Sequence, residues 1–291
     1  MEKLDSLRIL VLAENTVPFG ESLLGQHGLS FLLEGRREQT MMRVLMDVGQ
    51  VHDALCNNMQ QLNVDPGQID AIVLSHCHYD HTSGVAALLT ETRKQNVPVI
   101  AHPNIFRTHF VATPFLRHIG IAPEDSVQAL IQAGGQPFLT SGPLALMPGL
   151  TTTGEIPRVT SFEEVGLKVF TISEGHTLED NIDDDLSLVA CVQGQGLVVV
   201  TSCSHGGIIN IIKQAMSLFP GEKLHAVIGG LHLVGAATAR LTQTVEELSV
   251  FNPSLVSAGH CTGFKAQVAL YNALGERFVP LSTGAEFIFG A

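Results

Sequence analysis

Three histidines and an aspartate lie within six residues, directly after a short apolar run. The run spans residues 70–74, and the cluster consists of His76, His78, Asp80 and His81. A β-branched apolar run of this length is typical of a buried strand, and a helical pattern follows the cluster. Neutral imidazoles and a carboxylate are the ligands that Zn²⁺ and similar divalent ions prefer. The sequence therefore predicts a metal site on a strand-to-helix loop.

The spacing inside the cluster indicates two binding points. His76 and His78 alternate, so both can face one point, while Asp80 and His81 can face a second point nearby. We expect one or two divalent ions, with Zn as the first choice and Mn or Fe as alternatives. Asp80 is also the expected catalytic residue, because it can position a hydroxide or take its proton while it remains a ligand. The competing interpretation is a His-rich surface loop that binds no metal.

Three later loops after apolar runs also carry a histidine. His260 follows the run 255–258 and precedes a glycine-containing turn, and His205 follows the run 197–201. We expect these two as further metal ligands. His232, after the run 226–228, is placed among the substrate-binding residues. For His232, a metal-ligand role and a purely structural role stay open.

Apolar patterns define the elements that must position these loops. Expected strands span 7–12, 29–34, 44–47, 70–74, 98–103, 167–172, 186–192, 197–201, 226–228 and 255–258, with two more between 277 and 289. The turn between the second and third strands is expected at 35–38. Expected helices span 51–62, 85–93, 126–133, 208–219, 238–251 and 263–274. Repeated strand–loop–helix units predict a layered α/β domain with its sites along one edge.

Two stretches have neither periodicity. Residues from about 104 to 160 mix Pro, Gly, Thr and Phe, which indicates a lid-like insertion within a single domain of residues 1–291. The acidic stretch 179–185 lacks the pattern of an EF-hand calcium loop, so we expect most of it to be solvated.

Composition limits the classes of partner. The chain of 291 residues carries a formal net charge of −12, with 16 basic and 28 acidic residues, which disfavours nucleic-acid binding. The start of the sequence has no export signal and no run approaches a membrane span, so a cytoplasmic protein without a membrane partner is expected. The five cysteines form no apparent disulfide framework. The sequence does not indicate an oligomeric state.

The pattern His76-x-His78-x-Asp80-His81 after a strand resembles the signature of the metallo-β-lactamase superfamily. The resemblance covers most of the chain and implies a four-layer αβ/βα sandwich. It implies a metal-dependent hydrolase or a related transferase. Five later segments are similar to the branch of dihydropterin–ribofuranosylaminobenzene phosphate synthase-like proteins: Gly154–Arg158, Asp184–Asp185, Ser202–Ile208, Gly229–Leu233 and Gly259–Phe264.

The resemblance also implies roles for single residues. An aspartate at the position of Asp47 orients the metal loop in the superfamily. A histidine ligand in a Gly-His-Thr sequence is also usual, followed by an Asp or Cys ligand after the next hairpin. His176 lies in such a Gly-His-Thr sequence, and Cys203 lies at roughly the position of the second ligand. Whether either binds metal stays open, and we favour His205 as the ligand.

The implied function is an enzyme that acts on a phosphorylated or ester-like small molecule through a metal-activated hydroxide. A pterin diphosphate condensation, as in the name of the branch, is the second form of this hypothesis. Arg158 and Lys265 are expected to bind the substrate phosphate, because a guanidinium or a cation at a helix start favours anions. The alternative from another class is a metal-dependent small-molecule binding or sensing protein with little turnover.

Overall fold

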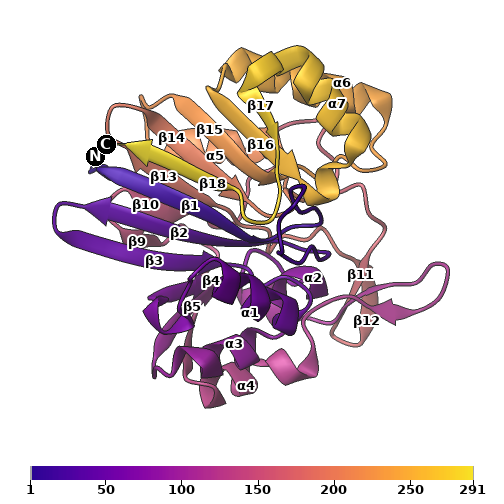
Figure 1. Ribbon diagram of the computed structural model, residues 1–291. Coiled ribbons are helices and arrows are strands. Elements are labelled where there is room, and N and C mark those ends of the chain that lie inside the picture. Colours follow the sequence, from indigo (N-terminus) through magenta and orange to yellow (C-terminus); the bar gives the residue numbers. More distant parts are fainter. Residues whose placement is uncertain (1, 291) are drawn as a thin grey trace.

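Two seven-stranded sheets stack face to face in the computed structural model, which describes residues 2–290 (Figure 1). In spatial order, the first sheet contains β18 (Glu286–Gly290), β1 (Ser6–Ala13), β2 (Ser30–Arg37), β3 (Thr40–Met46), β4 (Ala71–Val73), β5 (Val97–Ala101) and β8 (Gly135–Leu139). The second contains β17 (Phe278–Pro280), β16 (Leu255–Gly259), β15 (Leu224–Gly230), β14 (Gly196–Thr201), β13 (Leu188–Val192), β10 (Leu150–Thr152) and β9 (Ala145–Met147).

A buried apolar cluster fills the space between the sheets, with Phe31 and Val44 from the first and Leu188 and Ile228 from the second. The strands β13 and β14 are buried at every position, which explains their continuous apolar sequence. Such strands have no solvent face, so their ends are where polar side chains gather.

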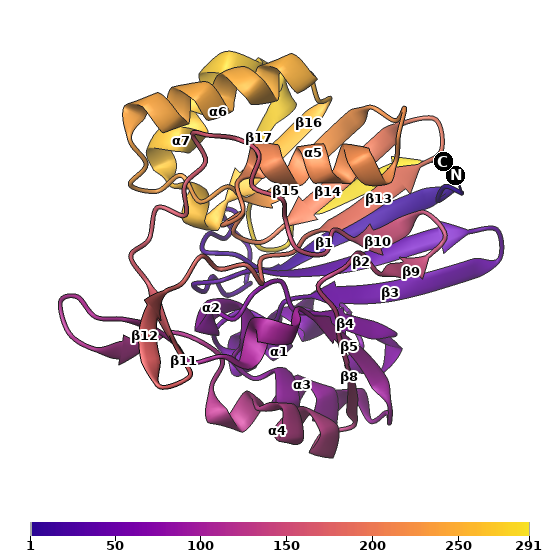
Figure 2. The ribbon, with the colours of Figure 1, turned by 180° about the vertical axis from the view of Figure 1, so that it is seen from behind.

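Helices cover the outer face of each sheet (Figures 1 and 2). The first sheet packs against α1 (His52–Gln61), α3 (Val85–Thr92) and α4 (Val127–Gln132), and the second against α5 (Ile208–Leu218), α6 (Thr238–Phe251) and α7 (Phe264–Leu274). In α5, Ile208, Ile211 and Ile212 are fully buried, and each such side chain contributes roughly 1.5–3 kcal/mol. The predicted four-layer αβ/βα sandwich is confirmed.

A small third sheet lies at the side of the sandwich (Figure 2). It contains β12 (His176–Glu179), β11 (Phe170–Ser173), β6 (His109–Val111) and β7 (Arg117–His118). The stretch expected as a lid-like insertion, 104–160, is thus divided: β6 and β7 belong to the third sheet, while β8, β9 and β10 belong to the two main sheets. The strand expected at 167–172 begins at Phe170, because it pairs with β6 and β12.

The turn expected at 35–38 lies further along the chain. Strand β2 continues to Arg37, and Gly35 pairs with Met42 inside the hairpin. Glu38, with φ +53°, provides the left-handed backbone that reverses the chain. Remaining short elements are α2 (Tyr79–Thr82) and the 3-10 helices Pro66–Gln68, Pro103–Phe106, Pro123–Asp125, His260–Thr262 and Gly275–Arg277. Among residues 2–290, no helix has the length and hydropathy of a membrane span.

Candidate metal centre

The candidate site lies where several strands end at one edge of the sandwich. Asp47 follows β3 and residues 75–81 follow β4, and these two strands are parallel neighbours. Residues 202–205, His232 and His260 follow β14, β15 and β16, which are also parallel neighbours. Because parallel strands end at the same edge, the five loops converge.

Asp47 holds two of these loops together. Its carboxylate is fully buried and accepts hydrogen bonds from the Ser75 backbone N–H (2.7 Å), the Ser75 hydroxyl (2.6 Å) and His81 Nδ1 (2.8 Å). The Ser202 hydroxyl donates a further bond to it from the loop after β14. These buried contacts exclude a surface position for Asp47 and are the hydrogen bonds expected of an aspartate that orients the metal loop.

These bonds determine which imidazole nitrogens carry protons. The Ser75 hydroxyl gives its proton to Asp47, so its oxygen accepts from His76 Nδ1 at 2.8 Å. His76 is then left with a bare Nε2. His81 donates from Nδ1 to Asp47, which leaves its Nε2 as the nitrogen that faces the candidate centre.

A series of hydrogen bonds through Asp180 and His109 determines which ring nitrogen of His78 carries a proton. Asp180 accepts from His109 Nδ1 at 2.8 Å and is also bound by the Arg107 guanidinium. The Nε2 of His109 is therefore an acceptor, and His78 donates to it from its own Nε2 at 2.9 Å. His78 Nδ1 is left bare, 3.0 Å from the bare Nε2 of His76.

Two lone pairs at this separation repel unless a cation lies beside them. Burial lowers the pKa of His76, His78 and His205 well below the usual value, so these imidazoles are neutral. Candidate ligand atoms of the three lie within 4.8 Å of one another. Both ring nitrogens of His205 are buried, and neither has a hydrogen-bond partner within residues 2–290. The donor set fits a divalent ion such as Zn²⁺.

A second group surrounds Asp80. Its Oδ2 lies 3.5 Å from the Nε2 of both His81 and His260, and 3.1 Å from His27 Nε2. His260 donates from Nδ1 to Asn15 Oδ1 at 2.8 Å, which leaves its Nε2 bare. Burial alone would raise the pKa of Asp80, but the neighbouring His81 and His260 hold it well below its usual range. The carboxylate is therefore ionised and available as a ligand.

Cys203 lies between the two groups. Its Sγ is 3.2 Å from His81 Nε2, and it forms candidate ligand sets with His76 and His81 and with His205 and His232. Burial alone would lower the pKa of His81, but the carboxylates of Asp80 and Asp47 raise it to about 10. The same negative field favours a metal cation at this nitrogen.

The two expected substrate cations differ in their surroundings. Arg158 is exposed, yet its guanidinium donates to the His205 carbonyl at 3.0 Å and to the Asn181 carbonyl, so it lies at the rim of the site. Lys265 is exposed in the first turn of α7, without a hydrogen bond or ion pair to any of residues 2–290.

His232 lies within the centre, and its ring centroid is 4.2 Å from that of His205. His176 is exposed on β12, where its Nδ1 donates to the Glu174 carbonyl. It belongs to none of the candidate ligand sets within the described chain. The structure thus brings His205, and not His176, to the metal loop.

The expectation of a solvated acidic loop at 179–185 is wrong for its key residues. Asp180, Asp184 and Asp185 are buried. Asp184 accepts from the Cys77 backbone N–H at 2.7 Å, and Asp185 accepts from that of Gly206 at 2.6 Å. Buried N–H groups of the metal loops need acceptors, and these carboxylates supply them.

Sequence reasoning also missed His109 and Asn15, and it gave His27 no role. The backbone of Gly28 passes so close to Asp80 that a Cβ at Gly28 would lie 1.8 Å from the Asp80 carbonyl oxygen. Glycine at this position lets the 27–28 segment approach the metal loop and sets His27 beside Asp80.

Comparison with known proteins places this geometry in a family. The family model described as the metallo-beta-lactamase superfamily matches residues 34–160. The 7,8-dihydropterin-6-methyl-4-(beta-D-ribofuranosyl)-aminobenzene-5'-phosphate synthase of Methanocaldococcus jannaschii is 34% identical over 285 residues, covering 97% of this chain and 96% of its own. An uncharacterized protein of the same organism is 32% identical and covers 90% of this chain and 93% of its own.

A solved structure agrees over the whole length. Tm1679, described as a metal-dependent hydrolase of the beta-lactamase superfamily, aligns with a TM-score of 0.80 at 21% identity, covering 98% of this chain and 100% of its own. At that identity the likeness shows the fold. The full-length identity of 34%, together with the matched family model, shows more: the chain belongs to the metallo-β-lactamase superfamily, in the dihydropterin–ribofuranosylaminobenzene phosphate synthase-like branch.

Proposed function

We propose that this protein is a metal-dependent enzyme that acts on a phosphorylated small molecule, with His76, His78 and His205 holding one ion and Asp80, His81 and His260 a second. One observation carries the proposal: His76 Nε2 and His78 Nδ1 face each other at 3.0 Å inside the protein, beside His205, whose two buried ring nitrogens have no hydrogen-bond partner within residues 2–290. An arrangement that is unfavourable without a cation is expected to have one.

The chain's own residues supply the rest of the site. A bound divalent ion supplies Lewis acidity toward a phosphoryl or carbonyl oxygen and lowers the pKa of a water to about 7. Asp80 is the proposed catalytic group, because its ionised carboxylate can accept a hydrogen bond from that water and position it. His27 lies half-exposed, with its Nε2 3.1 Å from the same carboxylate. Arg158, at the rim, would bind an anionic part of the substrate.

An anionic leaving group departs in both hydrolysis and condensation, and a bound cation would stabilise its negative charge. The arrangement therefore suits either reaction. The name of the 34% identical relative supports a condensation that joins a pterin to an aminobenzene ribofuranosyl phosphate. A sensing protein with little turnover is the alternative. Elemental analysis together with a panel of phosphodiester, lactone, thioester and pterin diphosphate substrates separates these possibilities. Metal-dependent turnover of a phosphorylated member supports the proposal, and tight binding without turnover of any member supports the alternative.

His205→Ala is expected to lower metal affinity by about 10–100-fold or more, because outer partners of metal ligands already contribute that much. His176→Ala should leave metal affinity within about twofold, since its imidazole is exposed on the third sheet. A metal-competition titration of both variants, with folding verified by circular dichroism, measures the difference. If His176→Ala lowers metal affinity more than His205→Ala does, then the histidine of the Gly-His-Thr segment, and not His205, is the third ligand.

Arg158→Ala is expected to raise KM for a phosphorylated substrate by about tenfold, the equivalent of one charge-assisted hydrogen bond of roughly 1.4 kcal/mol. Lys265→Ala should raise KM less, because this side chain is exposed and makes no fixed contact within residues 2–290. Metal content should be unchanged in both. Steady-state kinetics with elemental analysis provide the check, and unchanged KM in both variants would contradict the assigned anion contacts.

A further inference from the structure

A hollow of about 330 Å³ adjoins the candidate metal centre on the side of α6. Its walls come from residues 162–166, from the loop between β15 and α6, and from the first turns of α6. His232 belongs both to this lining and to the cluster around His205, so the hollow and the centre are contiguous. The lining includes Phe162, Glu164, Gly166, His232, Ala239 and Arg240.

Arg240 brings an incompletely paired cation to this hollow. Its Nε is buried and has no hydrogen-bond partner in the part of the chain that the structure describes. Gly166, with φ +73°, leaves room for the guanidinium, since a Cβ there would lie 3.0 Å from Arg240 Nη1. The nearby Glu163 is already used, because its carboxylate accepts from the N–H groups of Ile209 and Asn210. A partly buried guanidinium without a full set of acceptors favours an anionic ligand.

The start of α6 adds backbone donors to the same hollow. This helix has 14 residues, and its N-cap is Ala237, which has no side-chain acceptor. Ala237 and Ala239 both line the hollow and leave the first-turn N–H groups uncovered. The positive end of a helix dipole with free N–H groups is a favourable environment for a phosphoryl group.

His232 supplies a third sign of a ligand where the hollow meets the metal centre. The residue is 9% exposed, and its buried Nδ1 has no hydrogen-bond partner within residues 2–290. Its backbone is left-handed, with φ +44°, a conformation that costs about 1–2 kcal/mol for a non-glycine residue. An unpaired buried nitrogen held in a strained loop between two polar sites is typical of a functional contact.

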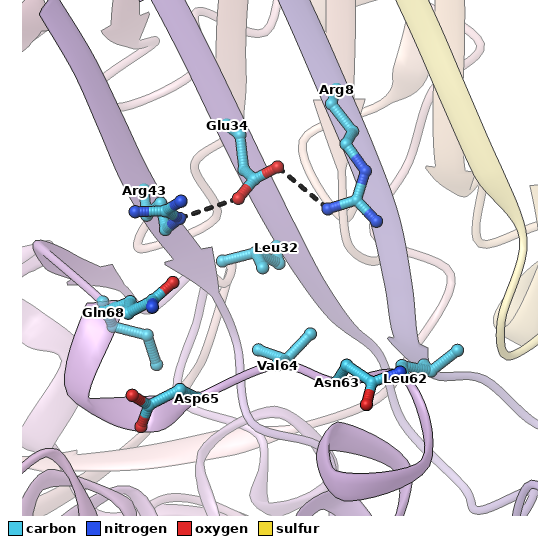
Figure 3. Close-up of a pocket in the computed structure, with 10 residues that line it drawn as sticks. Arg8, Leu32, Glu34, Arg43, Leu62, Asn63, Val64, Asp65 and Gln68 are labelled. Carbon is cyan, nitrogen blue, oxygen red and sulfur yellow. Dashed lines mark hydrogen bonds and ion pairs between the residues drawn. The ribbon is translucent and has the colours of Figure 1, made fainter.

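Another hollow with several charges has no such unpaired groups among its described lining residues. It encloses about 280 Å³ beside β1, β2 and β3, and Glu34 there accepts from Arg8 at 2.9 Å and from Arg43 at 2.7 Å (Figure 3). Those charges neutralise one another, whereas Arg240 makes no hydrogen bond or ion pair through its side chain within residues 2–290, although the carboxylates of Glu163 and Glu164 lie near enough to act on its charge.

We propose that the hollow at Arg240 is the subsite for the phosphoryl group of a phosphomonoester substrate. The guanidinium and the first turn of α6 bind the phosphoryl oxygens, and His232 donates a hydrogen bond on the side of the metal centre. This inference rests on the proposed function, because the reacting part of the same substrate must then reach the metals. In this arrangement Arg240 binds the phosphoryl end of the substrate, and the metals act on the other end.

The test uses metal-loaded protein and phenyl phosphate as the probe, with binding measured by calorimetry. Arg240→Gln, which keeps a polar side chain but removes the guanidinium charge, should weaken phenyl phosphate binding at least tenfold. Arg117→Gln, at an exposed position on β7, is the matched control and should bind like the wild type. Elemental analysis of the same samples should show equal metal content in all three proteins.

Ala239→Glu provides a second variant that is expected to fold, because a carboxylate in the first turn favours a helix. It places a negative charge in the hollow and should weaken phenyl phosphate binding at least tenfold, whereas Gln39→Glu, with the same charge at the exposed β2–β3 turn, should not. Wild-type protein that does not bind phenyl phosphate, or an unaffected Arg240→Gln, would overturn the subsite. If Arg240→Gln does not fold, unchanged binding in Ala239→Glu would overturn it. Wild-type protein without metal would instead contradict the proposed function.

Discussion

His76→Ala combined with His78→Ala is expected to remove at least one of the one to two transition-metal ions from each chain. The two side chains carry the nitrogens that face each other at 3.0 Å inside the protein. Removing both takes away two ligands of one ion and leaves His205 alone at that point. Elemental analysis of protein purified without chelator measures the loss directly.

Stability supplies a second measurement. A ligand at 100 times its dissociation constant stabilises the folded state by about 2.7 kcal/mol, so added Zn²⁺ should raise the free energy of unfolding of the wild type by at least this amount. The double variant should gain much less. His118→Ala with His176→Ala is the matched control, because both imidazoles are exposed and their removal should change neither metal content nor the response to Zn²⁺. If the variant with His76→Ala and His78→Ala keeps its full metal content, then the assignment of these two ligands is wrong.

The parts of this site that the sequence predicted are local in the chain. His76, His78, Asp80 and His81 stand close together in the chain after β4, and strand and helix periodicities predict them on a loop; the structure places His76 and His78 there, whereas Asp80 and His81 lie in the one-turn helix α2. His205, His232 and His260 could be grouped with them because each follows a buried parallel strand. A rule about strand ends therefore connects loops that are more than a hundred residues apart.

The groups that orient these ligands follow no such rule. His109 lies on β6, in an irregular stretch, and contacts His78 only because the third sheet folds against the metal loop. Its partner Asp180 lies in an acidic stretch whose composition indicates solvent. Charge alone cannot distinguish a solvated carboxylate from one that accepts hydrogen bonds inside a protein, because the partners come from distant segments.

Asp47→Asn is expected to destabilise the protein by about 3–5 kcal/mol and to lower the affinity for metal at both binding points. The carboxylate is fully buried and accepts from Ser75, His81 and Ser202. An amide offers one oxygen where two were used, and its NH₂ group faces donors that need an acceptor. Asn tolerates the left-handed backbone that Asp47 adopts, with φ +59°, so the effect will come from the lost acceptor and charge and not from backbone strain.

Both expected consequences have a common cause. Asp47 fixes the proton on His81 Nδ1 directly and on His76 Nδ1 through the Ser75 hydroxyl, so its loss frees one ligand of each ion to rotate or change tautomer. Urea unfolding with and without Zn²⁺, together with a metal-competition titration, measures the two effects separately. Asp53→Asn, exposed in the first turn of α1, is the control and should cost only about 0.3–1 kcal/mol through the helix dipole. If Asp47→Asn is no less stable than this control and keeps its metals, then the carboxylate does not orient the ligands, and the tautomers of His76 and His81 must be set by other groups.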